Sequence, residues 1–349
     1  MCLALAAVSV LAGGCAAAGN AAPRTARLES AAPTTAAPGN GQTYPAKGTS
    51  YVVVPDGDQL VWTDLKTGAH GHFGPADGSE LSSPSVSADG RRITFTQLPP
   101  LPSVQNLLAD GYEPSAGYWD LDTRSGGTLR PSAGIGWTVT SRPSISPDGT
   151  RVALAPSSGI YLAAVGGARL PIRLLPTVAQ EVAWDGDDAL AYLPALGHSN
   201  DCAVERVTLS AAATRCLLPT ATLQSLPASN GAGWQIDDVT GSGDPSLLTL
   251  DMRAHSPGGS TAQAVAILDP SAEATPLHVL ADTITTSPPV DGVQATSRFS
   301  VLVDQGSQVL YTVNAGPGSQ AKIFQSSING GAPRRVGISP GMGLGATSE

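Results

Sequence analysis

Between residue 50 and residue 338 the chain alternates between short apolar runs and polar breaks. The runs are rich in β-branched and aromatic residues, and Gly, Pro, Asp or Asn interrupts them about every 8–12 residues. Runs of this length and spacing predict an all-β domain. A helical period is nowhere sustained beyond two or three turns, and residues 104–109 are the best helical candidate.

Two segments repeat one pattern. Residues 84–95 are Pro-Ser-Val-Ser-Ala-Asp-Gly-Arg-Arg-Ile-Thr-Phe, and residues 143–154 are Pro-Ser-Ile-Ser-Pro-Asp-Gly-Thr-Arg-Val-Ala-Leu. Each predicts strand, Asp-Gly turn and strand, because Gly adopts a positive φ without strain and Asp bonds its own backbone. Weaker copies of this hairpin are residues 182–186 with 189–193, residues 234–239 with 246–251, and residues 290–295 with 299–304.

A second hairpin follows the first in most units, for example residues 159–165 with 171–175. Four antiparallel strands form the unit of a β-propeller blade. The sequence therefore predicts a six-bladed β-propeller over residues 50–338, with a seven-bladed or irregular ring as the alternative. The blades are expected at residues 50–80, 84–131, 142–176, 180–219, 232–280 and 288–338. The first unit has only three strands, and the Gly-rich tail, residues 339–349, is either loose or supplies the fourth and closes the ring.

One part of the chain resembles a known repeat. Residues 146–154, with Ile160-Tyr161-Leu162 and Gly166-Gly167 after them, resemble the repeat of TolB-like, WD40-like β-propellers, and residues 87–95 are similar. The resemblance extends over residues 84–176. It implies a six-bladed propeller in a secreted or envelope protein that works by binding.

The N-terminal 49 residues differ from the rest. An apolar run ends in Leu-Ala-Gly-Gly-Cys, which resembles a bacterial lipobox with Cys15 as the lipidated residue. Ala12 stands where Leu is commoner, and no basic residue precedes the run, so an ordinary signal peptide is the alternative. We expect a lipoprotein signal peptide at residues 1–14, a disordered tether at residues 15–49, and anchoring to the extracytoplasmic face of a bacterial membrane.

Two cysteines remain in the body of the chain. Cys202 and Cys216 flank one expected hairpin and are predicted to form a disulfide in an oxidising compartment, with two separately buried thiols as the alternative. A tight turn at residues 210–213 would not place them opposite each other, so the disulfide requires a shifted turn.

Composition and charge limit the classes of protein to which the chain can belong. The chain has 40 Gly and 29 Pro in 349 residues, which excludes a long-helix protein, and its net charge of −9 without a basic patch disfavours nucleic-acid binding. The sequence lacks Gly-x-Ser-x-Gly, His-Glu-x-x-His, P-loop and Cys-x-x-Cys motifs, and no cofactor is predicted. His70 and His72 share a strand face without a third ligand, so no metal site is predicted. Asp89 and Asp148 are expected to be turn residues.

The connections between strands are unequal. In four blades the second-to-third connection is long, namely residues 97–115, 194–202, 253–261 and 314–320. Long insertions on one side of a rigid scaffold indicate a binding face. The alternative is that these loops have no function and are tolerated because closing a longer loop costs little free energy. The residues expected to bind are Tyr112, Glu113, Trp137, His198, Asn200, Asp201, Arg253 and His255.

The sequence thus predicts a lipid-anchored, non-enzymatic scaffold of extracytoplasmic location. It is expected to be a monomer that binds an envelope or extracellular protein, with no nucleic-acid partner. The alternative is a secreted propeller hydrolase or lyase acting on a carbohydrate or small molecule. That enzyme would require two carboxylates, or a carboxylate and a His, at the mouth of the central channel.

Overall fold

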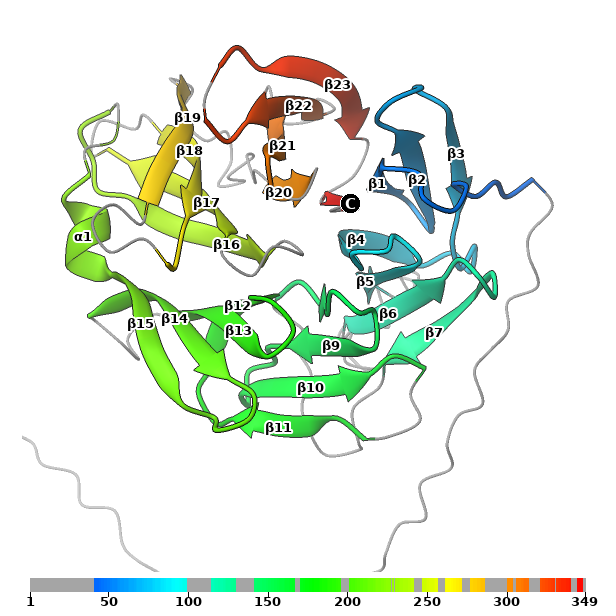
Figure 1. The fold of residues 1–349 in the computed structure, drawn as a ribbon, viewed down its shortest axis with the longest axis horizontal. Coiled ribbons are helices and arrows are strands. Elements are labelled where there is room, and N and C mark those ends of the chain that lie inside the picture. The colour runs from blue at the N-terminus through cyan, green and yellow to red at the C-terminus, as the bar shows by residue number, and fades with distance from the viewer. Residues whose placement is uncertain are drawn as a thin grey trace, which may run out of the picture. The chain divides into compact units, whose positions relative to one another are not determined.

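Short strands joined by turns build the whole of the described chain. The computed structural model describes residues 41–98, 114–129, 141–166, 170–195, 201–226, 228, 230–241, 247–256, 261–271, 277–285, 300–303, 306–313, 321–329, 331–339 and 344–347, all within one unit, residues 33–349. Over these residues the strands form six four-stranded antiparallel sheets arranged as a six-bladed β-propeller, which confirms the predicted fold (Figure 1).

The strands of each sheet follow one another outward from the centre of the ring. The first three sheets are β24 (Gly345–Ala346), β1 (Tyr51–Asp56), β2 (Gln59–Asp64), β3 (His70–Phe73); β4 (Glu80–Val86), β5 (Arg92–Leu98), β6 (Ser115–Asp120), β7 (Ser125–Leu129); and β8 (Ser144–Ile145), β9 (Arg151–Leu154), β10 (Ile160–Ala164), β11 (Ile172–Leu175). The other three are β12 (Ala179–Trp184), β13 (Ala189–Pro194), β14 (Cys202–Thr208), β15 (Thr214–Pro219); β16 (Gln235–Gly241), β17 (Leu248–His255), β18 (Thr261–Leu268), β19 (Leu277–Thr285); and β20 (Ser300–Val303), β21 (Gln308–Val313), β22 (Ala321–Ser327), β23 (Arg334–Ser339).

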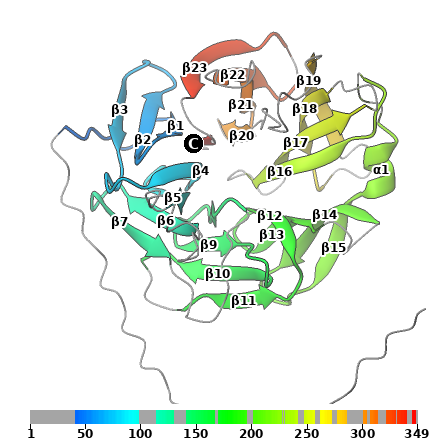
Figure 2. The same cartoon turned by 180° about the vertical axis from the view of Figure 1, so that it is seen from behind.

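The end of the chain completes the first sheet. β24 pairs antiparallel with β1, with Gly345 opposite Val53 and Ala346 opposite Val52. The N–H of Thr347 donates to the carbonyl of Tyr51, and the N–H of Tyr51 donates to Oγ1 of Thr347, each at 3.1 Å. Both views place the C-terminus near the centre, beside β1 and β4 (Figures 1 and 2). β24 is therefore the fourth strand of the first blade, in which residues 50–80 supply only three.

Strand order fixes which connections share a face of the ring. Because neighbouring strands are antiparallel, first-to-second and third-to-fourth connections emerge on one face, which we call the short-turn face. Second-to-third connections and the crossings between sheets emerge on the other, which we call the long-loop face. All four long insertions of the sequence run to the long-loop face, and so do the crossings of residues 130–143, 220–234 and 286–299.

The repeated Asp-Gly turns connect neighbouring blades on the short-turn face. Arg92, two residues after the Gly of its turn, donates from Nη1 to the carbonyl of Gly149 in the next blade at 3.0 Å. Arg151 has the equivalent position and donates from Nη2 to the carbonyl of Asp187 in the blade after that, at 2.7 Å. The repeat therefore encodes a link between blades as well as a hairpin.

The core lies between neighbouring blades. The largest cluster joins the fourth and fifth blades and includes Leu193, Val204, Leu250 and Met252. The four Trp residues that lie in or beside strands pack in such clusters: Trp62, Trp119, Trp184 and Trp234 are all buried. Burial of these rings supplies much of the apolar area that holds adjacent sheets together.

The sixth blade differs from its prediction. The sequence pairs residues 299–304 with residues 290–295, which lie outside the described residues, whereas in the structure β20 pairs with β21. Gly306, at φ 81°, forms the turn between them. The prediction was wrong because this turn lacks the Asp-Gly pair that marks the other hairpins.

Helix is confined to one short element in the described part of the chain. α1 (Thr220–Gln224) follows Pro219 in the crossing from β15 to β16, and buried Leu223 anchors it. No helix in the described ranges is long and apolar enough to cross a membrane. The helical candidate at residues 104–109 lies outside the described residues.

The segment before β1 contacts the first blade. Thr43 donates its N–H to the carbonyl of His72 at 2.9 Å and accepts a bond from Nε1 of Trp62 at 2.9 Å. The ring of Tyr44 stacks on Phe73, with centroids 5.7 Å apart. These residues fall in the predicted tether. They cover part of the outer edge of β3, which has no strand partner on that side in the described sheet.

Candidate functional site: the channel mouth on the long-loop face

The predicted binding residues belong to connections or strand ends on the long-loop face. Tyr112 and Glu113 precede β6, Trp137 lies in the crossing before β8, and His198 and Asn200 precede β14; these five lie outside the described residues. Asp201 is described and exposed, and its carbonyl accepts a bond from the N–H of Thr220 at 3.0 Å. Arg253 and His255 are the last predicted pair, at the end of β17.

Arg253 and His255 meet a carboxylate and a hydroxyl. Nη2 of Arg253 lies 2.8 Å from Oδ1 of Asp237, on the innermost strand β16. Nδ1 of His255 lies 2.9 Å from Oγ1 of Thr261, across the strand pair β17–β18. Burial raises the pKa of the Asp237 carboxyl, while the charges of Arg253 and His255 oppose that rise. The rim of the fifth blade is therefore polar and mostly charge-paired.

Sequence reasoning missed a second group, deeper in the channel mouth. Arg142 lies just before β8, Glu181 near the start of β12, and Asp238 in β16, so three consecutive blades contribute. Nη2 of Arg142 lies 2.8 Å from Oδ2 of Asp238, and both side chains are at least nine-tenths buried. The backbone N–H of Arg142 donates to Oε2 of Glu181 at 3.0 Å, and its Nη1 donates to Oγ1 of Thr240 at 2.7 Å.

Two carboxyl groups therefore meet at Arg142: Asp238 pairs with its guanidinium, and Glu181 accepts its backbone N–H. Loss of water around Glu181, and secondly the negative charge of Asp238, raise the pKa of the Glu181 carboxyl well above its usual range. Burial also raises the pKa of Asp238, while the neighbouring Arg142 opposes the rise. A carboxyl that retains its proton near neutral pH can donate a hydrogen bond or a proton.

Local irregularity places both carboxyl groups. The pairing of β12 with β13 shifts register between Ala179 and Glu181, and the pairing of β16 with β17 shifts between Ile236 and Asp238. A β-bulge redirects the side chain that follows it, which simple alternation does not anticipate. The available signal was weak: Glu181 is a charged residue in the short, mostly apolar strand β12, whereas Asp238 follows another Asp in the mostly polar strand β16.

A small cavity lies inside the ring below these groups. Arg142, Ser144, Thr240 and Trp184 line it together with β4 and β24, and its volume is ≈ 30 Å³. Such a space has room for one or two water molecules.

The remaining sequence candidates are structural. Asp89 accepts bonds from Oγ of Ser87 at 2.6 Å and from the N–H of Arg91 at 2.9 Å, and Asp148 accepts equivalent bonds, so both residues close their turns as expected. His70 is exposed on β3 and His72 is half-buried there. Among the residues described, no group of three His, Cys, Asp or Glu side chains is arranged to hold a metal ion.

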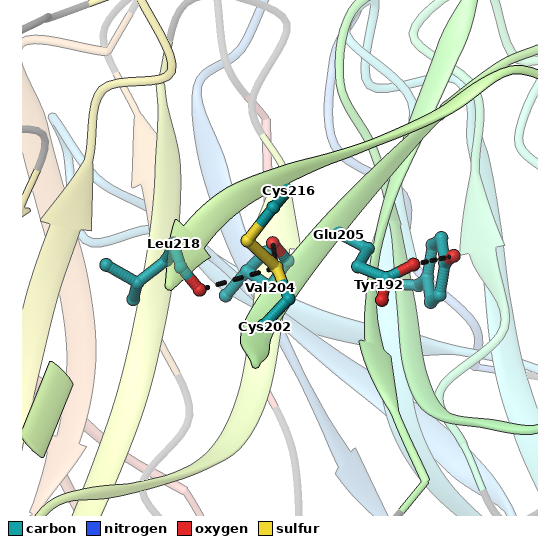
Figure 3. The surroundings of a disulfide bond; sticks show 6 residues. All are labelled: Tyr192, Cys202, Val204, Glu205, Cys216 and Leu218. Carbon is teal, nitrogen blue, oxygen red and sulfur yellow. Dashed lines mark hydrogen bonds between the residues drawn. A yellow bond between two sulfur atoms is a disulfide. The ribbon is translucent and has the colours of Figure 1, made fainter. Parts of the chain in front are cut away.

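The predicted disulfide is present. Cys202 and Cys216 are bonded, with Cα atoms 5.7 Å apart, between β14 and β15 (Figure 3). Two register shifts between these strands, beside Val204, produce the offset that a tight hairpin alone would not allow. In the same blade Tyr192 donates a short hydrogen bond to Glu205 (Figure 3). The disulfide fixes the hairpin whose upstream connection carries His198, Asn200 and Asp201.

Comparison with known proteins gives a likeness of fold. No protein-family model and no curated protein matches the chain. Solved structures that resemble it include hydrazine synthase of Kuenenia stuttgartiensis (13% identity over 87% of this chain and 80% of that one, TM-score 0.45) and an oligogalacturonate lyase in complex with manganese (12%, 84% and 86%, 0.45). A puromycin-hydrolyzing peptidase of Mycobacterium tuberculosis is 16% identical over 85% of this chain and 44% of its own length, with a TM-score of 0.46. At these identities the likeness concerns the fold alone.

Proposed function

We propose that this chain is a lipid-anchored, extracytoplasmic β-propeller that binds a protein or envelope component on its long-loop face and performs no catalysis. The observation that carries the proposal is the concentration of long connections on one face. Every long second-to-third insertion and the three longest crossings run to that face, whereas most turns on the opposite face are short. Rigid scaffolds commonly present their contact residues on such loops.

The charge pairing at the channel mouth supports binding over catalysis. Asp238 is paired with Arg142 and Asp237 with Arg253, so these carboxylates already have cationic partners. A face that carries most of the long connections suits a macromolecular partner, whose contact surface is broad.

A photo-crosslinking residue placed at position 255 or at position 122 tests the binding face. His255 and Asp122 are both exposed, but they lie on the long-loop and short-turn faces respectively. We expect crosslinks to one saturable envelope partner from position 255 only, with competition by unlabelled protein. Equal crosslinking from both positions would contradict the assigned face.

Replacement of the expected lipidated residue tests the anchor. Cys15→Ala should move the protein from the membrane fraction to the soluble extracytoplasmic fraction, because the residue that would carry the lipid is then absent. Cys216→Ser serves as the matched cysteine control and should leave the distribution between fractions unchanged. Unaltered membrane association of Cys15→Ala would overturn lipid anchoring at this residue.

The second candidate is a hydrolase or lyase acting on a carbohydrate or small molecule. It is favoured by one observation, the meeting of Glu181 and Asp238 at the channel mouth, where the sequence analysis placed the requirement for an enzyme. A protonated Glu181 would be the general acid of such an enzyme. A panel of acidic and neutral oligosaccharides, with Glu181→Gln as the inactive control, distinguishes the two: turnover that this variant abolishes would establish the enzyme, and absence of turnover would support the binding scaffold.

A further inference from the structure

In the described part of the channel mouth, one carboxyl group has no ion-pair partner. The guanidinium of Arg142 lies against Asp238 and the neutral hydroxyl of Thr240. Glu181 receives the backbone N–H of Arg142 at Oε2, which carries only a partial charge. Two ionised carboxylates beside one guanidinium would place an excess negative charge in a largely buried position, which is costly.

The charged groups on the surrounding strands are engaged elsewhere. Asp237 on β16 pairs with Arg253 on the neighbouring strand β17. On β13, Tyr192 donates to Glu205. On β9, the guanidinium of Arg151 stacks over the ring of Trp184, 4.7 Å from its centroid, at the far end of β12. In the described part of the chain these strands bring no second cation to Glu181.

We infer that Glu181 is a proton-binding site of the folded protein: its carboxyl group takes up a proton on folding, and this proton stabilises the junction of the third, fourth and fifth blades at the long-loop face. The protonated group still accepts the N–H of Arg142 through its carbonyl oxygen. Asp238 then keeps the whole charge of the guanidinium. Loss of the proton places a second negative charge beside Asp238 where the chain enters β8.

The sign of the pH effect follows from the difference in bound protons. In the unfolded chain Glu181 has an ordinary pKa near 4.5, whereas the folded pKa lies well above it. Between these two values the folded state binds more protons than the unfolded state, so the free energy of unfolding falls as pH rises. The contribution is complete below the unfolded pKa and is lost as pH rises through the folded value. The ring is therefore expected to be most stable under mildly acidic conditions.

Denaturant unfolding of the mature protein over a pH series tests the inference. In the unmodified protein the slope of the free energy of unfolding against pH should correspond to uptake of about one proton on folding through the titration of Glu181. In Glu181→Gln, an uncharged replacement of the same shape, that uptake should disappear. Glu80→Gln, at an exposed position of β4, is the matched control and should keep the slope of the unmodified protein. An unchanged slope in Glu181→Gln would overturn the inference.

A measurement on the unmodified protein keeps the test decisive if Glu181→Gln fails to fold. The carbon-13 shift of the Glu181 carboxyl, in protein labelled at the glutamate side chains, reports protonation directly. We expect its shift to change from the carboxylic-acid value to the carboxylate value at a pH well above the usual range of a glutamate side chain. A titration of Glu181 within that usual range would overturn the proposal, whatever the stability data.

Discussion

At the scale of single residues, close approach between innermost strands decides which side chains are allowed. Gly241 ends β16 beside the end of β12, and a Cβ atom at that position would lie 1.6 Å from the carbonyl oxygen of Trp184. The contact is with backbone, which cannot move without displacing β12. The absence of a side chain at position 241 therefore permits the fourth and fifth blades to meet at the channel.

Gly241→Ala should be strongly destabilising for this reason. We expect a loss of about 3 kcal/mol in the free energy of unfolding, typical of severe overpacking in a core. Gly233→Ala is the matched control, because a Cβ there has no heavy atom within 4 Å, and its effect should stay below about 1 kcal/mol. Urea unfolding of both variants checks the prediction, and similar losses at the two positions would show that the close approach is not the cause.

At the scale of elements, the repeated turn carries an arginine that links one blade to the next. Arg151 donates to the carbonyl of Asp187 and also lies over the ring of Trp184, so it joins the third blade to the fourth by two contacts. Arg92 makes the first kind of contact between the second and third blades. These links lie on the short-turn face, away from the loops of the proposed binding face.

Arg151→Ala should lower the free energy of unfolding by about 1 kcal/mol, the sum expected for one partly exposed hydrogen bond and one cation–π contact. Lys66→Ala, an exposed basic residue in a turn of the first blade, is the control and should change stability little. Binding at the long-loop face should be unchanged in both variants. If Arg151→Ala lost no more stability than the control, the contacts of Arg151 would not stabilise the junction of the third and fourth blades.

The disulfide is the second element whose contribution can be measured. It closes a segment with a sequence separation of 14, for which restriction of the unfolded chain gives about 3 kcal/mol. The double variant Cys202→Ser with Cys216→Ser should lose about this much stability. Adding a reductant should destabilise the unmodified protein to the same level and leave the double variant unaffected. A reductant effect that persists in the double variant would contradict this origin.

The elements were more predictable from the sequence than the site was. Asp-Gly turns with apolar runs on both sides are local signals, and they identified the hairpins of the second and third blades. The prediction of the first hairpin failed in the sixth blade, where the turn before Gly306 lacks an Asp-Gly pair. The group of Arg142, Glu181 and Asp238 could not be predicted, because its members are far apart in sequence and two register shifts aim its carboxyl groups. The position of Arg253 and His255 on the long-loop face could be predicted, because they end a strand that precedes a long insertion; their role in binding stays a prediction.

At the scale of the whole molecule, ring closure depends on the shortest strand of the first blade. β24 contributes only Gly345 and Ala346 to the sheet, but Leu344 before it and Thr347 after it are also buried. Leu344 and Ala346 pack in the cluster that joins the sixth and first blades, with Val301 and Leu310. The last described residues of the chain thus hold together blades formed by its beginning and its end.

Removal of residues 344–349 should open this junction. We expect a loss of about 3–5 kcal/mol in the free energy of unfolding, because a buried Leu, its neighbours and both hydrogen bonds between Thr347 and Tyr51 are lost together. Thr347→Val isolates the hydrogen bond from Tyr51 to Oγ1 and should cost about 1 kcal/mol, whereas Thr347→Ser retains the acceptor and should cost less. Thermal and urea unfolding measure the series. If the truncated protein unfolded at the same denaturant concentration as the full chain, β24 would be dispensable and the blades would hold the ring by their side-to-side packing alone.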